Sequence, residues 1–318
     1  MRDPGGGQPS SLHAGDRVAV VAPSGPVDSD RLERGAAVLR SLGLDVTFGR
    51  HVLDVAPGLP HLAGTDADRA ADLQAAWCDP EIAAVFCARG GYGAARVLDH
   101  LDWAALGRAT PKLLHGSSDI TALHVAFGRR LGVATSFGPM VASLIADGEP
   151  EALDHLRAAI FDRGAPVAGT HALRAGRATG TLTGGNLALL TSLLATPYAP
   201  EPATGRIAFL EDVGEAPYRV DRMLTQLRQA GWFDGVAGIV LGTWTGCGDL
   251  DAVFADRLGP LGVPILAGVP VGHGPRQLTI RLGASVMLDA DALVLHPGVP
   301  DARGRRSGPP GAFAGETP

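Results

Sequence analysis

The chain has 318 residues, of which 46% are hydrophobic and 5% aromatic, and its formal net charge is −6 at pH 7. This length suffices for two domains, or one large one, with a sizeable core. The modest negative charge, the lack of a basic tract and the scarcity of aromatic residues argue against nucleic acid and anionic membranes as partners.

Neither the first 16 residues nor any later segment resembles a membrane-directed sequence. The N-terminus has no apolar signal core, and no later apolar run is long enough to span a bilayer. Three cysteines lie far apart, which predicts neither a disulfide framework nor a zinc site, and Cys87 fits a small core residue. We expect a cytoplasmic protein without a bound metal or cofactor.

Short β-rich runs alternate with helical patterns through the first half of the chain. The strands are predicted at 17–22, 45–48, 82–87 and 113–114, and the helices at 32–42, 66–77 and near 97–98. This alternation predicts a parallel sheet with right-handed crossovers, whose ligands bind at the carboxyl ends of the strands. Residues that follow a predicted strand are therefore the first candidates for a site.

The segment 112–121 is the strongest of these candidates. An apolar run ends at a glycine, two serines and an aspartate follow, and a helical pattern then begins. We predict a strand, a sharp turn with Ser118 at its apex, and a helix whose N-terminal N–H groups stabilise negative charge. This is the geometry of a nucleophile elbow, although the usual Gly-x-Ser-x-Gly sequence motif is absent. The alternative is that Ser117, Ser118 or Asp119 only caps the helix.

A second candidate is the glycine-rich loop 88–93, which follows the predicted strand 82–87. It could cradle a phosphate, or its N–H groups could hold a tetrahedral oxyanion formed by attack of Ser118. It lacks both the dinucleotide-binding glycine pattern and the Walker lysine. The remaining alternative is a plain turn that needs positive φ.

The pattern changes at 163–180, where glycines and a proline predict a linker or a crossover in irregular strands. Beyond it we predict helices at 187–194 and 220–229, strands at 207–210, 237–241 and 264–269, and a closing antiparallel pair formed by 278–282 and 292–295. The tail beyond residue 301 has a composition typical of disorder.

A serine nucleophile needs a base. His273 lies in a turn between two glycines, just after a predicted strand, and its alternative role is structural. His115 is expected to point away from Ser118 within its strand, and His124 is expected to be solvated or packed on the following helix.

The base in turn needs an orienting carboxylate. Glu211 directly follows the predicted strand 207–210, and Asp212 and Glu215 are its competitors. The chain order Ser118, Glu211, His273 is the nucleophile, acid, base order of the α/β-hydrolases.

Taken together, seven motifs resemble those of the LD-carboxypeptidases of the S66 serine peptidase family, over roughly residues 15–300. The motifs are Ala22-Pro-Ser-Gly25, Ala88-Arg-Gly-Gly-Tyr-Gly93, Gly116-Ser-Ser-Asp-Ile-Thr121, Gly184-Gly-Asn186, Leu210-Glu-Asp-Val213, Tyr218-Arg-Val-Asp-Arg-Met-Leu224 and Gly272-His-Gly274. The resemblance implies an α/β fold in which a Rossmann-like N-terminal domain with a parallel sheet is joined to a smaller β-rich α/β C-terminal domain. We expect a flexible N-terminus (1–14), the first domain (15–162), a linker (163–180), the second domain (181–300) and a disordered tail (301–318).

Carried over by motif, the resemblance assigns the nucleophile to Ser118, the acid to Glu211 and the base to His273. It assigns the oxyanion donors to the region of Gly90 and Gly91 and to the backbone N–H of Asp119. One departure is Ser117, where the family commonly has an aromatic residue, and this puts the shape of the cleft in doubt. The connection 245–249 is short, and the resemblance implies that its length is relevant to the choice of substrate, because insertions near it differ between branches of the family.

The implied function is removal of a terminal D-alanine from muropeptide tetrapeptides, or from a small peptide substrate, during cell-wall recycling by a homodimer. The alternative within the family is a microcin C-type self-immunity peptidase that cleaves aminoacyl-nucleotide analogues. The alternative from another class is a non-catalytic nucleotide- or sugar-binding α/β protein, in which Ser118 is only a cap.

Overall fold

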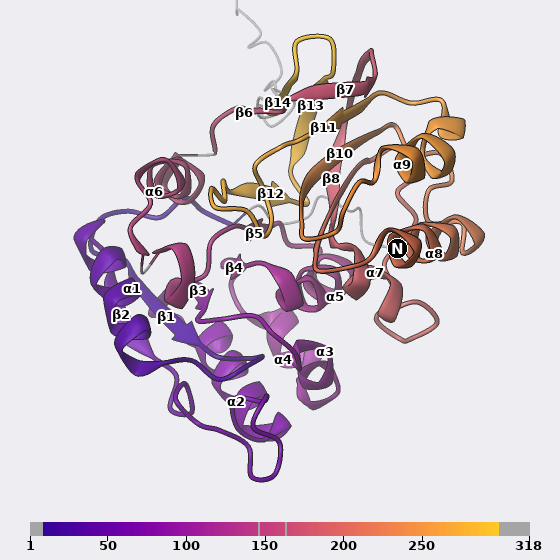
Figure 1. The fold of residues 1–318 in the computed structure, drawn as a ribbon. Coiled ribbons are helices and arrows are strands. Elements are labelled where there is room, and N and C mark those ends of the chain that lie inside the picture. Colours follow the sequence, from indigo (N-terminus) through magenta and orange to yellow (C-terminus); the bar gives the residue numbers. More distant parts are fainter. Residues whose placement is uncertain (1–8, 146, 163, 299–318) are drawn as a thin grey trace, which may run out of the picture.

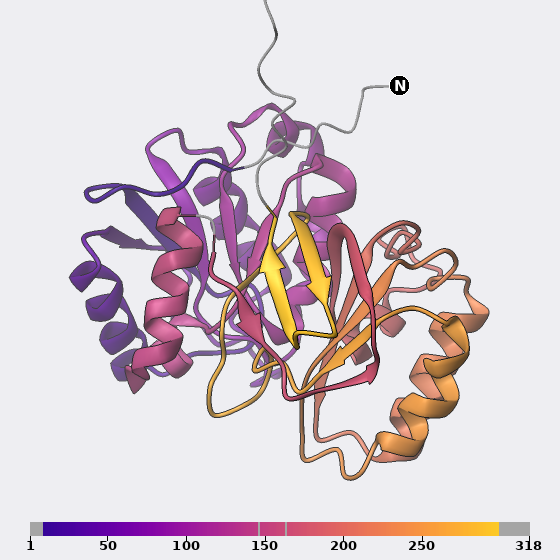
Figure 2. The same ribbon diagram turned by 90° about the horizontal axis from the view of Figure 1, so that it is seen from above.

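The computed structural model describes residues 9–145, 147–162 and 164–298 (Figure 1). The described chain forms two sheets with helices packed around them. The first half, indigo to magenta, and the second half, orange to yellow, lie side by side in both views (Figures 1 and 2). No helix within the described ranges is long and apolar enough to cross a bilayer.

The first sheet has six strands in the order β12-β5-β4-β3-β1-β2. Its strands are β1 (Arg17–Val21), β2 (Asp45–Phe48), β3 (Ile82–Cys87), β4 (Leu113–Gly116), β5 (Thr135–Phe137) and β12 (Ile280–Leu282). The first five are parallel, as their alternation with helices predicts, and β12 joins β5 in the antiparallel direction. The helices of this half are α1 (Ser29–Ser41), α2 (Asp66–Cys78), α3 (Ala94–Val97), α4 (Trp103–Arg108), α5 (Thr121–Leu131) and α6 (Pro150–Arg157).

The second sheet has eight strands in the order β6-β14-β13-β8-β9-β10-β11-β7. Its strands are β6 (Val167–Ala168), β7 (His171–Arg174), β8 (Arg177–Asn186), β9 (Ile207–Val213), β10 (Gly238–Thr245), β11 (Ile265–Ala267), β13 (Ser285–Asp289) and β14 (Val294–Pro297). The central strands β8, β9, β10 and β11 are parallel, and the flanking strands pair in the antiparallel direction. Helices α7 (Leu187–Ser192), α8 (Pro217–Gln229) and α9 (Asp251–Arg257) belong to this half.

Five short helical turns complete the described secondary structure. Three are 3-10 turns (Leu98–His100, Ser118–Ile120 and Gly259–Leu261), and two are π-type segments (Val141–Ile145 and Ala158–Asp162). This α/β architecture with a parallel sheet and a second, β-rich half is the fold class that the sequence predicts.

The predicted closing pair of 278–282 with 292–295 is wrong. β12 pairs with β5 of the first sheet, whereas β14 pairs with β13 in a hairpin. Gly283, with φ +81°, turns the chain between β12 and β13, so β12 leaves one sheet before β13 enters the other. The hairpin turn is held by Asp289, whose Oδ1 accepts a hydrogen bond from the N–H of Ala292 at 2.9 Å.

Two segments are more ordered than their composition suggests. The stretch 163–180, expected as a linker, contributes β6, β7 and the start of β8 from residue 164 onward. In the expected flexible N-terminus, Leu12 is buried and its N–H donates to the carbonyl of Ile160 at 2.9 Å. Backbone pairing and burial of apolar groups stabilise both segments. Residues 1–8 and the predicted disordered tail 301–318 lie outside the described ranges.

The two sheets meet through a shared apolar core. Phe137 of β5 and Phe209 of β9 pack edge to face, with ring centroids 5.2 Å apart. Helix α5, which begins directly after the predicted elbow, contacts both α7 and β8 of the second half. The carboxyl end of β4 is thereby held close to the carboxyl ends of β8 and β9.

Candidate active site

Ser118 occupies the sharp turn that the sequence predicts. Strand β4 ends at Gly116, the 3-10 turn Ser118–Ile120 follows, and α5 continues from it. Ser118 has φ +59°, the left-handed backbone region that residues other than glycine rarely adopt. Such a conformation persists only where the surrounding structure imposes it, and it is common at functional sites.

His273 lies between the side chains of Ser118 and Glu211. Its Nε2 atom is 3.0 Å from the Ser118 hydroxyl, and its Nδ1 atom is 2.7 Å from Oε2 of Glu211. An ionised carboxylate only accepts hydrogen bonds, so Nδ1–H donates to Glu211 and Nε2 is left to accept from the hydroxyl. A side chain at Gly272 (φ +120°) would lie 2.5 Å from Oε2 of Glu211, so this contact requires a glycine before His273.

Glu211 is fully buried within β9 rather than after its end. Its second oxygen, Oε1, accepts a hydrogen bond from Nδ2 of Asn186 at 3.3 Å. The backbone N–H of Asn186 donates to Oγ1 of Thr121 at 3.0 Å, and Thr121 begins the helix that follows Ser118. Asn186 therefore connects the helix of the serine to the carboxylate. In the sequence, Asn186 stands out only as the last residue of the motif Gly184-Gly-Asn186, and this motif is the one signal that could have indicated its role.

The pKa of His273 reflects opposing influences. Burial lowers it, but the hydrogen bond and negative charge of Glu211, with a smaller contribution from Asp212, outweigh burial, and the net pKa is raised. Glu211 thus favours the protonated imidazole, as a partner that stabilises a transient imidazolium must.

The two competing carboxylates make other contacts. Asp212 is buried and accepts hydrogen bonds from Nδ2 of Asn186 and from the N–H groups of Ala188 and Val213, at 2.8–2.9 Å. Burial raises its pKa. Glu215 lies 3.5 Å from the guanidinium of Arg219. Of the three candidates, Glu211 is the one that the structure brings to His273.

The glycine-rich loop packs directly against the serine. A side chain at Gly90 would lie 3.0 Å from Cβ and 3.3 Å from Oγ of Ser118, so a glycine at this position favours the close approach of the loop to the serine. Gly91 follows with φ +108°. Asp119 directly follows Ser118 and is buried. The residues expected to supply oxyanion donors are therefore beside the hydroxyl.

The two histidines near Ser118 in the sequence are buried and already paired. His115 contacts Oγ of Ser136 at 2.9 Å and the carbonyl of Pro139 at 2.7 Å. His124 donates to the carbonyl of Gly116 at 3.0 Å. Burial lowers the pKa of each to about 4, so both are neutral at pH 7. Their contacts fit the packing roles that the sequence suggests.

One group of side chains in the described ranges has the spacing of metal ligands: His51, Asp54 and Asp68. The Nδ1 atom of His51 is 2.7 Å from Asp54, and its Nε2 atom is 3.8 Å from Asp68. Both ring nitrogens thus face carboxylates, which hold the loop after β2 to the start of α2. The group shares no residue with the Ser118 site, and we assign it no ligand.

Two of the three cysteines are buried and all three are free. Burial raises the pKa of the Cys87 thiol, which fits the predicted core residue.

A serine, a histidine and a carboxylate linked in this order, on an α/β fold, have the geometry of a serine hydrolase. Comparison with known proteins agrees. The model of the LD-carboxypeptidase N-terminal domain matches residues 18–138, and that of the LD-carboxypeptidase C-terminal domain matches residues 179–288. The chain belongs to the LD-carboxypeptidase family and is a carboxypeptidase.

Three relatives illustrate the similarity. A putative carboxypeptidase of Streptomyces coelicolor is 51% identical over 293 residues, covering 89% of this chain and 94% of the relative. The murein tetrapeptide carboxypeptidase of Pseudomonas aeruginosa is 34% identical over 297 residues, covering 87% and 94%. The microcin C7 self-immunity protein, in complex with aspartyl sulfamoyl adenosine, has a TM-score of 0.82 at 23% identity, covering 91% and 97%, which shows a shared fold.

Proposed function

We propose that this protein is a serine LD-carboxypeptidase that removes the terminal D-alanine from muropeptide tetrapeptides through Ser118, His273 and Glu211. The observation that carries the proposal is the chain of contacts from the Ser118 hydroxyl through His273 to Glu211, at 3.0 and 2.7 Å. The murein tetrapeptide carboxypeptidase among its relatives supports the choice of substrate.

The reaction begins when Nε2 of His273 accepts the proton of Ser118 and Oγ attacks the carbonyl carbon before the terminal D-alanine. Glu211 holds the required tautomer and stabilises the imidazolium that forms. N–H groups of the Gly90–Gly91 region and of Asp119 stabilise the tetrahedral oxyanion. His273 then returns its proton to the leaving amine, D-alanine departs, and an acyl-enzyme remains.

Water completes the cycle. His273 takes a proton from the water molecule, which attacks the acyl-enzyme carbonyl, and the shortened muropeptide leaves with a free carboxylate while Ser118 regains its proton. No step requires a metal or cofactor, because the chain itself supplies the nucleophile, the base, the orienting acid and the oxyanion donors.

The microcin C-type activity is the second candidate within the family. Its support in this chain is the fold shared with the microcin C7 self-immunity protein at 23% identity, and fold similarity at that level does not transfer a substrate. The murein relative is more similar, at 34% identity, and we therefore favour the muropeptide. Membership of a carboxypeptidase family disfavours the non-catalytic binding protein.

Mass spectrometry of a tetrapeptide muropeptide digest tests the substrate. We expect loss of one D-alanine from the tetrapeptide and no change in a tripeptide control. Cleavage of an aspartyl sulfamoyl nucleoside with no change in the tetrapeptide would contradict the proposal.

We further propose a cytoplasmic homodimer, which the family resemblance implies. Light scattering coupled to size exclusion tests the oligomeric state, and a mass near one chain would contradict the dimer. Cell fractionation tests the location.

A further inference from the structure

Three loops at the carboxyl ends of neighbouring strands meet beside Ser118. Ser24 follows β1, the loop 88–93 follows β3, and Ser118 itself follows β4. The N–H of Gly25 donates to the carbonyl of Gly90 at 3.0 Å, so the first two loops are in direct contact. The positions of all three decide where oxyanion donors lie relative to the serine.

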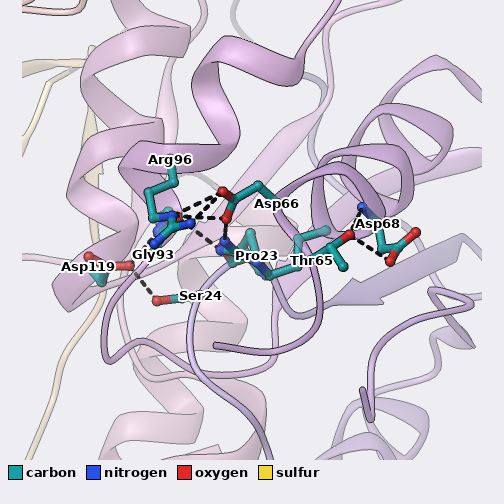
Figure 3. Close-up of polar contacts among 10 residues, drawn as sticks. Pro23, Ser24, Thr65, Asp66, Asp68, Gly93, Arg96 and Asp119 are labelled. Carbon is teal, nitrogen blue, oxygen red and sulfur yellow. Dashed lines mark hydrogen bonds and ion pairs between the residues drawn. The ribbon is translucent and has the colours of Figure 1, made fainter. Parts of the chain in front are cut away.

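The Asp119 carboxylate ties the first two loops to the third. Its Oδ2 atom accepts a short hydrogen bond from the Ser24 hydroxyl (Figure 3). The same atom accepts a second hydrogen bond, at 2.7 Å, from the N–H of Ala94. Asp119 and Ser24 are both buried. One oxygen atom, on the residue directly after the nucleophile, thus holds the loop after β1 and the first residue of α3, which directly follows the glycine-rich loop.

Arg69 of α2 holds the same two loops through other atoms. Its guanidinium is fully buried and donates to the carbonyl of Pro23 and, at 2.9 Å, to that of Gly93. It also pairs with Asp66. Asp66 in turn pairs with Arg96 (Figure 3). A side chain at Gly93 would lie 2.8 Å from Nη1 of Arg69, so the loop can approach the guanidinium only through a glycine.

This network holds the segments that are expected to donate hydrogen bonds to the oxyanion, and the positions of these donors relative to Ser118 affect the rate. The backbone N–H of the residue after the nucleophile is an oxyanion donor in enzymes with a nucleophile elbow, and that residue here is Asp119. Gly90 lies close to the same serine, since a Cβ atom placed on it would be 3.3 Å from Oγ of Ser118. Oxyanion donors must lie about 2.7–3.1 Å from the oxyanion, and a shift of about 1 Å can cost on the order of a hundredfold in rate.

We propose that the side chain of Asp119 is a positioning residue, which together with Ser24 and Arg69 fixes the glycine-rich oxyanion loop against Ser118. The inference rests on the proposed function, because it requires that Ser118 attacks and that an oxyanion forms. It adds a role for the Asp119 side chain that is distinct from that of its backbone N–H.

Asp119→Ala tests the side chain and keeps the backbone N–H. Two quantities are measured: turnover of the tetrapeptide, and affinity for a peptide boronic acid that forms a tetrahedral adduct with a serine. We expect kcat/KM and boronate affinity to fall together, on the order of a hundredfold, with KM changed less than about threefold. Asp119→Asn restores an acceptor oxygen and should recover at least about tenfold of both.

Ser24→Ala removes one donor to the same carboxylate and should cause a smaller parallel loss. Adding Ser24→Ala to Asp119→Ala should cause no further loss, because the two residues then act through one contact. If Asp119→Ala does not fold, kcat/KM and boronate affinity of Ser24→Ala and Asp119→Asn still test whether the Asp119 side chain positions the loops.

Asp72→Ala is the matched control. Asp72 is also a buried carboxylate, on the same helix as Arg69, but it accepts from the N–H of His51 at 2.7 Å, and within the described residues no hydrogen bond links its side chain to the three loops. It should lower the melting temperature without changing boronate affinity.

Boronate affinity and kcat/KM within about threefold of wild type in both Asp119→Ala and Ser24→Ala would overturn the inference, as would an equal loss in Asp72→Ala. If the wild type binds the boronate but releases no D-alanine, the proposed substrate is wrong, and the boronate comparison still decides the role of Asp119.

Discussion

The Ser118 hydroxyl lies 3.0 Å from Nε2 of His273, although the two residues are 155 positions apart in the chain. Ser118 follows a strand of the first sheet, and His273 lies in a turn after β11 of the second. The candidate site therefore exists only where the two halves of the molecule pack together. Any change that shifts one half relative to the other should lower activity before it unfolds either half.

Ser118→Ala should lower kcat by a factor on the order of 10⁴ to 10⁶, because loss of a triad nucleophile removes the covalent route. Ser117→Ala is the matched control. Ser117 is buried beside the turn, and no hydrogen bond found within the described residues joins its hydroxyl to His273 or Glu211, so its loss should cost about tenfold or less. Steady-state kinetics on one tetrapeptide substrate compares the two. A crippled Ser117→Ala with an active Ser118→Ala would show that the nucleophile is the other serine.

Glu211→Gln should lower kcat strongly, on the order of 10³-fold or more, because an amide disfavours the working tautomer of His273. Asp212→Asn should mainly lower stability, since Asp212 accepts three hydrogen bonds within the second half. Glu215→Gln should be nearly silent. Kinetics and thermal melting of all three variants separate these effects, and a larger catalytic loss in either control would place the orienting acid elsewhere.

The rate should depend on the protonation of His273. The base acts when neutral, so kcat/KM should be low in acid and rise with pH through one apparent pKa, above the ordinary value of about 6.5 because Glu211 raises it. Glu211→Gln should lower this apparent pKa, while Glu215→Gln should leave it in place. A pH–rate profile in which both variants match the wild type would contradict the coupling of His273 to Glu211.

Thr121→Val tests the link between the two halves. It leaves the buried N–H of Asn186 without its acceptor, which should cost about 1–3 kcal/mol of unfolding free energy and lower kcat. Thr191→Val is the control, because Oγ1 of Thr191 donates to carbonyls of its own helix and not to a residue of the proposed site. Chemical denaturation with kinetics measures both. Equal effects of the two variants would mean that the Thr121 contact has no special role.

Chelation should leave activity unchanged, because the proposed mechanism assigns no role to a metal. Turnover is measured after exhaustive dialysis against EDTA and after zinc is added back. Loss of activity with EDTA and recovery with zinc would direct attention to the group formed by His51, Asp54 and Asp68.

Much of the fold could be predicted because its signals are local. A run of consecutive apolar residues predicts the strand at 82–87. An apolar run followed directly by a glycine and polar residues predicts the turn at Ser118. The choice of partner for a short strand is not local. Strand β12 has three residues and could pair with several edges, and its pairing with β5 depends on how the two sheets pack.

The same distinction applies to the site. Ser118, Glu211 and His273 could be named from their places after predicted strands, their order and the family resemblance. The supporting contacts could not. Arg69 falls within the predicted helix 66–77 without any further signal, and its contacts with Pro23 and Gly93 join residues that no local pattern relates. Asn186 likewise acts across 25 positions on Glu211.

Covalent labelling tests the central claim most directly. Wild-type protein is treated with a fluorophosphonate, and the modified residue is located by peptide mass spectrometry alongside assays of D-alanine release. The account predicts one adduct, on Ser118, formed in step with loss of D-alanine release, and little labelling of Ser118→Ala or of His273→Ala. Full D-alanine release by a protein labelled at Ser118, or undiminished release by Ser118→Ala, would contradict it.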